Sequence, residues 1–109
     1  MDLFERAVFS DISPKVVDQF LTFHKENPEI YALFKRFAFE ARAAGRKRFG
    51  AAAICERIRW HVAVERKNDD FKVNNNFRSC LARLMIFDHP EFADFFETRR
   101  TPGTVSEAA

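Results

Sequence analysis

The hydrophobic positions of the chain recur every three or four residues over most of its length, which is the period of an amphipathic helix. A first clear helix opens with Ser13 as N-cap and Pro14 at its first position, and is predicted to stop before Pro28. A second helix starts at Pro28 and runs to Gly45, a residue that commonly ends helices. The apolar stripe of this second helix comprises Ile30, Leu33, Phe34, Phe37, Ala41 and Ala44.

A third helical stretch, "GAAAICERIRWHVAVER" at residues 50–66, is apolar on two sides. One side carries Ala51, Ile54, Cys55, Ile58 and Val62, and the other carries Ala53, Arg57, Trp60 and Val64. A helix that is apolar on two sides is usually central and packed by two neighbours, so this pattern predicts a buried Trp60. The alternative is an exposed Trp60 that binds a partner.

Three consecutive asparagines precede the last long helix. Asn74 is the predicted N-cap of a helix from Asn75 to about Phe87. A helical wheel places Phe77, Cys80, Leu81, Leu84 and Met85 inward. The outward face is predicted to hold Asn75, Ser79, Ala82 and Ile86, flanked by Arg78 and Arg83. One asparagine suffices as a cap, so the other two are either turn residues or available for recognition.

Short extended segments separate these helices. "RKRF" at 46–49, "FKV" at 71–73 and "FFETRR" at 95–100 are predicted to be strand-like, and "PEFADF" at 90–95 a short helix. The fold class predicted by this order is a mainly α, single-domain, winged helix-turn-helix-like bundle with short strands, in which "FFETRR" pairs with "RKRF" or "FKV" as a small wing. The domain is expected to span residues 14–100, after an N-terminal extension at 1–13 and before a flexible tail at 101–109.

Charge is distributed unevenly although the net charge is only +2. Residues 46–67 contain 7 basic and 2 acidic residues, which gives this block a net charge of +5. Such a block can attract phosphates, or it can be an ordinary solvated helix face.

Signals for catalysis, metal binding and membrane insertion are weak. His24, His61 and His89 lie far apart in the sequence, and Cys55 and Cys80 do not form a CxxC pair of the kind that binds zinc. Neither a metal nor another cofactor is therefore expected. The two cysteines have the pattern of buried thiols in a reducing compartment. No apolar run approaches the ~20 residues of a membrane span. The N-terminus has no signal-peptide pattern. We therefore expect a cytoplasmic protein that is not an enzyme.

Four segments carry a resemblance to known sequences: "FHKENPEIYALF", "GRKRFGAAAICERIRW", "DDFKVNNNFRSCLARLM" and "PEFADFFETRR". With these segments the chain resembles, from about Phe20 to Arg100, a family of short phage and prophage proteins of unassigned function. The resemblance implies a phage origin, a location in the cytoplasm of the bacterial host, and partners such as phage DNA, host DNA or a host protein.

The leading hypothesis is a small phage-type DNA-binding protein, regulatory or accessory to phage DNA metabolism, that uses the helix after Asn74 as its recognition helix. The residues expected to face the groove of double-stranded DNA are Asn75, Asn76, Arg78, Ser79 and Arg83. Those expected to hold the DNA backbone are Arg46, Lys47, Arg48, Arg99 and Arg100.

The alternative hypothesis is a phage-encoded inhibitor that binds a host defence protein or a host enzyme. Its anchor would be an apolar patch of Phe39, Trp60 and Ile86, exposed together. Neither hypothesis involves a membrane, and both leave a homodimer open.

Overall fold

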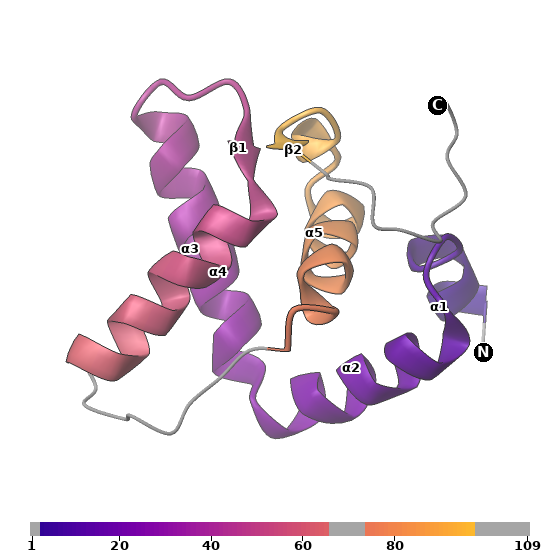
Figure 1. Ribbon diagram of the computed structural model, residues 1–109. Coiled ribbons are helices and arrows are strands. Elements are labelled where there is room, and N and C mark those ends of the chain that lie inside the picture. Colours follow the sequence, from indigo (N-terminus) through magenta and orange to yellow (C-terminus); the bar gives the residue numbers. More distant parts are fainter. Residues whose placement is uncertain (1–2, 66–73, 98–109) are drawn as a thin grey trace.

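The computed structural model describes residues 3–65 and 74–97, which form a mainly helical fold (Figure 1). The helices are α1 (Leu3–Val8), α2 (Pro14–Glu26), α3 (Pro28–Ala43), α4 (Ala51–Trp60) and α5 (Phe77–Asp88). A π-helical turn, His61–Glu65, continues α4, and a 3-10 turn, Pro90–Phe92, follows α5. The strands are β1 (Phe49–Gly50) and β2 (Phe96–Glu97). The predicted strand at 71–73, Arg99, Arg100 and the predicted tail at 101–109 lie outside the described residues.

The helix ends follow the local chemistry of the sequence. The Ser13 hydroxyl oxygen accepts a hydrogen bond from the Val16 N–H at 3.3 Å and so caps α2. Pro28 occupies the first position of α3, where its missing N–H costs nothing. Gly45 ends α3 with a φ of 98°, a left-handed conformation that side chains with a Cβ rarely adopt. These predicted boundaries are confirmed.

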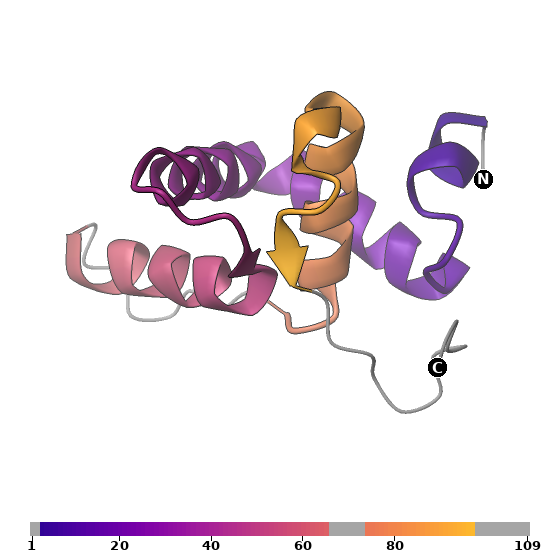
Figure 2. The same cartoon turned by 90° about the horizontal axis from the view of Figure 1, so that it is seen from above.

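Helix α5 occupies the centre of the fold, because it packs against α1, α2, α3 and α4 (Figures 1 and 2). The predicted inward residues Phe77, Cys80, Leu81, Leu84 and Met85 are all buried. The prediction that Ala82 points outward is wrong, since Ala82 is 0% exposed. Ile86, also predicted outward, is only partly exposed and packs against the core. A central helix buries more than one side, and the predicted recognition face is partly covered for that reason.

Helix α4 lies at the edge of the molecule beside α3 and β1 (Figure 2). Its predicted core stripe, which includes Ile54, Ile58 and Val62, is buried. Helix α4 packs against both α3 and α5, but its other side is open to solvent, because Trp60 is 52% and Val64 50% exposed. The prediction of a buried Trp60 is therefore wrong. Its exposure agrees with the alternative, in which the binding of a partner stays a prediction.

The N-terminal segment contributes to the same core as the other helices. Val8 and Phe9 are buried, and the Phe9 ring meets the Phe20 ring at a centroid distance of 5.9 Å. Helix α1 packs against α5 through this segment. Residues 3–9 therefore belong to the packed body, although the sequence predicts an extension there.

The two strands pair as predicted between "FFETRR" and the end of "RKRF". Phe49 aligns with Phe96, and the Phe49 N–H donates to the Phe95 carbonyl oxygen at 2.8 Å. The pair is parallel and two residues long, whereas a wing made from a hairpin is antiparallel. Its effect is to fix the end of the α3–β1 connection against the segment that follows α5.

Among the helices of the described segments, none combines the length and the apolar character that crossing a membrane requires.

Candidate functional site

The connection between α3 and β1 carries three adjacent cations, Arg46, Lys47 and Arg48, which we term the basic loop. All three are exposed, and none forms an ion pair with another described residue. The Arg46 guanidinium lies 5.8 Å from the centre of the Phe49 ring, which orients one side of the loop. The loop projects at the top of the view in Figure 1, away from the start of α5.

Backbone hydrogen bonds close the C-terminus of α3 without help from these cations. The Gly45 N–H donates to the Arg42 carbonyl oxygen at 3.0 Å, and the Arg46 N–H donates to the Ala41 carbonyl oxygen at 3.1 Å. This is the Schellman arrangement, which satisfies carbonyl groups that lysine and arginine side chains sometimes cap. The three charged groups of the basic loop are therefore left to the solvent or to a ligand.

A hollow of about 350 Å³ lies beside the basic loop. It is lined by Arg42, Gly45, Arg46, Lys47, Glu91, Asp94 and Phe95. Arg42 is paired within this lining, because its guanidinium stands 3.9 Å from the Glu91 carboxylate, and it also lies 5.0 Å from the centre of the Phe92 ring. The hollow thus mixes cations with two carboxylates, whereas Arg48 of the basic loop does not line it.

The asparagines before α5 form local hydrogen bonds. The prediction that Asn74 is the N-cap of this helix is wrong, because the N-cap is Asn76, whose side chain makes no capping hydrogen bond. The Asn74 side-chain oxygen instead accepts from the Asn76 N–H at 2.8 Å and closes a turn before the helix. The regular helix begins at Phe77, two residues later than predicted, because the capped turn precedes it. The Asn75 side-chain oxygen accepts from the Arg78 guanidinium at 2.9 Å. The first turn of the predicted recognition helix is therefore internally bonded, although the three asparagines are exposed and Arg78 is partly exposed.

Arg83 does not flank an open face. Its guanidinium donates to both carboxylate oxygens of Asp11, with Nε at 3.2 Å from Oδ1 and 3.1 Å from Oδ2. The hydrogen bond from Arg83 lowers the pKa of Asp11 below its usual value, more than partial burial raises it. Arg83 therefore joins α5 to the connection between α1 and α2.

The structure separates the residues predicted to contact DNA into two groups. Asn75, Asn76, Arg78 and Ser79 lie at the start of α5, at the opposite end of the fold from the basic loop (Figure 1). A single basic face that joins helix and wing is therefore not formed by the described residues. Arg99 and Arg100 fall outside them.

The predicted apolar anchor is also divided. Phe39 is partly exposed and makes edge contacts with the rings of His89 and Phe92, at centroid distances of 5.1 and 4.9 Å. Trp60 belongs to α4, and Ile86 is half-buried against the core. The three side chains do not form one exposed patch.

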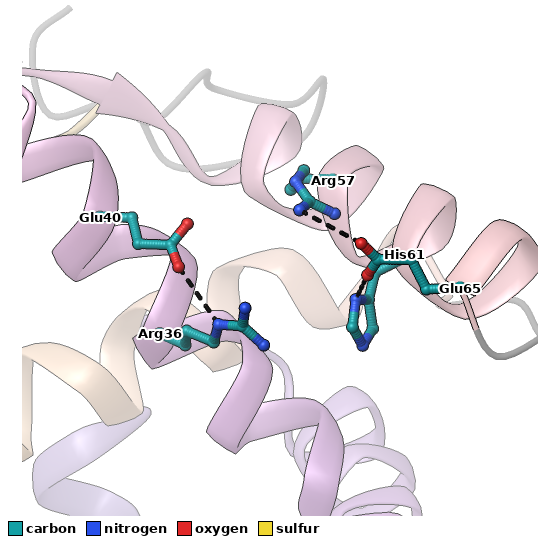
Figure 3. A network of polar contacts seen from close by, with 5 residues as sticks. All are labelled: Arg36, Glu40, Arg57, His61 and Glu65. Carbon is teal, nitrogen blue, oxygen red and sulfur yellow. Dashed lines mark hydrogen bonds and ion pairs between the residues drawn. The ribbon is translucent and has the colours of Figure 1, made fainter.

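Helices α3 and α4 share a face whose organisation the sequence did not indicate (Figure 3). The Arg57 guanidinium lies 4.3 Å from the centre of the Phe37 ring and 5.1 Å from that of Trp60. It also stands 4.0 Å from the Glu65 carboxylate, which contacts His61 Nδ1 as well. Helical spacing could have suggested two parts of this network, the His61–Glu65 pair four residues apart and the Arg57–Trp60 pair three residues apart.

An apolar groove of about 300 Å³ lies on this face. It is lined by Phe37, Glu40, Ala41, Phe49, Ala53, Ile54 and Arg57. Glu40 is paired with Arg36 on α3 at 3.2 Å, so the polar groups at the rim are engaged while the floor is apolar (Figure 3). Such a groove suits an apolar side chain better than a phosphate.

The described residues contain no group of three or more His, Cys, Asp or Glu side chains arranged to hold a metal ion. Cys55 and Cys80 are buried free thiols, and desolvation raises the pKa of each to about 12. Neither is suited to act as a nucleophile, because the reactive form is the thiolate.

Comparison of the whole chain with protein-family models, with curated proteins and with solved structures finds no match. The function is therefore argued from the geometry of the described residues.

Proposed function

We propose that this protein binds double-stranded DNA through its phosphate backbone, with the basic loop as the principal contact. The observation that supports the proposal is the group of Arg46, Lys47 and Arg48, which are adjacent, exposed and without ion pairs among the described residues. Arginine and lysine side chains supply most of the sequence-independent affinity for DNA, because they neutralise phosphates and release counterions.

The proposed fold relationship is a divergent winged helix-turn-helix. It rests on the order of helices and on the strand pair beside the basic loop, which would occupy the position of a wing. Burial of Ala82 and the bonding of Arg83 to Asp11 leave α5 poorly placed to enter a groove. In this proposal the basic loop therefore makes the main contacts with DNA. Smaller contributions come from Asn75, Asn76, Arg78 and Ser79.

The resemblance to short phage proteins suggests a role accessory to phage DNA metabolism in the host cytoplasm. An inhibitor of a host protein is the weaker candidate, because Trp60 would have to serve as the apolar contact without Phe39 and Ile86 beside it.

The test is the salt dependence of binding to a labelled random duplex, measured by fluorescence anisotropy. Each phosphate contact adds about 0.9 to the slope of log affinity against log salt concentration. The triple variant Arg46→Ala, Lys47→Ala, Arg48→Ala should therefore lower the slope by about 2.7. It should also bind more weakly than the parent at every salt concentration.

A matched control removes three exposed cations elsewhere, with Arg6→Ala, Lys15→Ala and Lys25→Ala on α1 and α2. The control changes the net charge by the same amount and should keep most of the parent slope. Absence of duplex binding by the parent at about 50 mM salt, where such contacts are strong, would overturn the proposal. An equal loss of slope in the control and loop variants would also overturn it.

A further inference from the structure

Trp60 is the one tryptophan of the chain, and half of its side chain faces solvent. Its ring contacts the Arg57 guanidinium at 5.1 Å, and Val64 is exposed to a similar degree one turn further on. Large exposed aromatic side chains are enriched at the centres of protein interfaces. The outer side of α4 therefore presents an apolar knob.

The same side of α4 also presents a hole. Ala53 lines the apolar groove of about 300 Å³ and precedes Trp60 by seven residues. Seven residues of helix turn back to within about 20° of the starting direction and rise about 10.5 Å. The knob and the groove thus lie on one face, and Arg57 borders both of them.

We propose that two copies of this chain associate through this face, with their α4 helices antiparallel and Trp60 of each copy in the α3–α4 groove of the other. The two-fold axis would pass beside Glu56 and Arg57, which lie midway between Ala53 and Trp60. Trp60 of each copy then faces Ala53 and the groove of the other copy. Such an interface is isologous, since the same patch serves both subunits.

The charges on this face permit two identical surfaces to meet. Arg36 pairs with Glu40 at 3.2 Å, and Arg57 stands 4.0 Å from Glu65 (Figure 3). Glu56, close to the proposed axis, is 3.6 Å from Arg59 of its own helix. Each of these cations has a carboxylate partner within its own copy, so the two faces do not repel one another. The apolar groove with a paired polar rim matches the usual anatomy of a protein interface.

The groove does not overlap the basic loop, so this inference stands independently of DNA binding. A second copy fits better than a phosphate ligand, because the floor of the groove consists of side chains such as Phe37, Phe49 and Ile54.

The first test is molar mass by light scattering over a range of protein concentrations. The parent should rise from 12.8 kDa towards twice that mass as concentration increases. Trp60→Ala removes the knob and Ala53→Arg blocks the hole, and each should weaken dimerisation at least about tenfold, as loss of a central interface residue does. Phe87→Ala is the matched control, because Phe87 is equally exposed but lies on α5, and it should dimerise as the parent does.

Two further measurements separate the dimer from its alternatives. The emission of Trp60 should shift to shorter wavelength as concentration rises, because the ring leaves water. Glu56→Cys should form a disulfide-linked dimer under oxidation much faster than Glu26→Cys on α2, and the buried Cys55 and Cys80 contribute little background.

Three results would overturn the inference. The first is a mass that stays at 12.8 kDa at the highest concentration. The second is a Trp60 emission that stays constant over the concentrations at which the mass rises, since the ring would then lie outside the interface. The third is equal cross-linking of Glu56→Cys and Glu26→Cys.

Discussion

Arg83 and Asp11 are joined by a forked contact between residues that lie 72 positions apart in the sequence. The guanidinium Nη2 reaches Asp11 Oδ2 at 2.5 Å while Nε reaches Oδ1 at 3.2 Å. This geometry is the one in which arginine binds a carboxylate most specifically. The contact holds the connection between α1 and α2 against α5, so Arg83 has a structural role in the folded chain.

Arg83→Ala should lower the free energy of unfolding without changing DNA binding. The Asp11 side chain is half exposed, so the loss should be about 0.2–1 kcal/mol, as for partly solvated ion pairs. Urea denaturation of Arg83→Ala, Asp11→Ala and the double variant measures this coupling. The reverse pattern, in which Arg83→Ala leaves the stability unchanged and lowers the slope of DNA affinity against salt by about one unit, would mean that Arg83 contacts DNA.

The stabilisation from Asp11 should depend on pH. Its pKa is lowered in the folded state, chiefly by the hydrogen bond from Arg83, relative to the ordinary value of 3.8. A carboxyl group of this kind stabilises the fold above its unfolded pKa, and the stabilisation disappears as pH falls through the folded pKa. The difference in unfolding free energy between the parent and Asp11→Asn should therefore be constant near neutral pH and shrink below about pH 3.8. A difference that grows in acid would contradict the assignment.

The boundaries of α2 and α3 were predictable because short-range chemistry decides them. Ser13, Pro28 and Gly45 act on the backbone within a few residues of their own positions, and each does in the structure what its residue type favours. The inward stripe of α5 was equally predictable, since Phe77, Leu81 and their neighbours follow the helical period.

The packing around α4 and α5 was not predictable in the same way. Alanine fits both a buried and an exposed position, so the pattern could not decide between them for Ala82. An apolar second side on α4 has the same sequence signature whether a neighbouring helix covers it or not, so Trp60 was placed wrongly. The partner of Arg83 lies 72 residues away, and no local rule indicates it. The basic loop was found from composition, because three consecutive cations leave a signal that needs no tertiary information.

Tyr31→Phe should destabilise the fold by about 1 kcal/mol, the usual effect of removing one hydrogen bond. The Tyr31 hydroxyl donates to Asp88 Oδ2 at 2.6 Å and so links α3 to the end of α5. Burial, and then this hydrogen bond, raise the pKa of Tyr31 above its ordinary value. Thermal unfolding followed by circular dichroism measures the loss. Asp88→Asn retains an acceptor oxygen and should therefore cost less stability than Tyr31→Phe. If Tyr31→Phe is as stable as the parent or more stable, the hydrogen bond contributes nothing.

Asn74→Ala and Asn75→Ala should differ in their effect on stability. Asn74 caps the turn before α5 through the Asn76 N–H, so its loss should cost about 1 kcal/mol. The Asn75 side chain forms one hydrogen bond among the described residues, which it accepts from the Arg78 guanidinium at the surface, so its loss should be nearly neutral. Chemical denaturation of both variants checks the order. A larger loss of stability for Asn75→Ala than for Asn74→Ala would mean that the turn before α5 starts one residue later.

The thiols of Cys55 and Cys80 should be unreactive in the folded protein. Both side chains are buried, and desolvation raises each pKa from 9.0 to about 12, so almost no thiolate forms near neutral pH. A group whose folded pKa is raised stabilises the fold below its unfolded pKa, and this contribution is lost as pH rises from about 9 towards 12. A chromogenic disulfide reagent should therefore titrate no thiol in the native protein at about pH 8, and two thiols after unfolding in guanidinium. Cys55→Ala, unfolded in the same way, should release half the signal and so serves as the internal calibration. Rapid reaction of one thiol in the native parent, with the fold intact by circular dichroism, would mean that α4 or α5 opens locally to expose it.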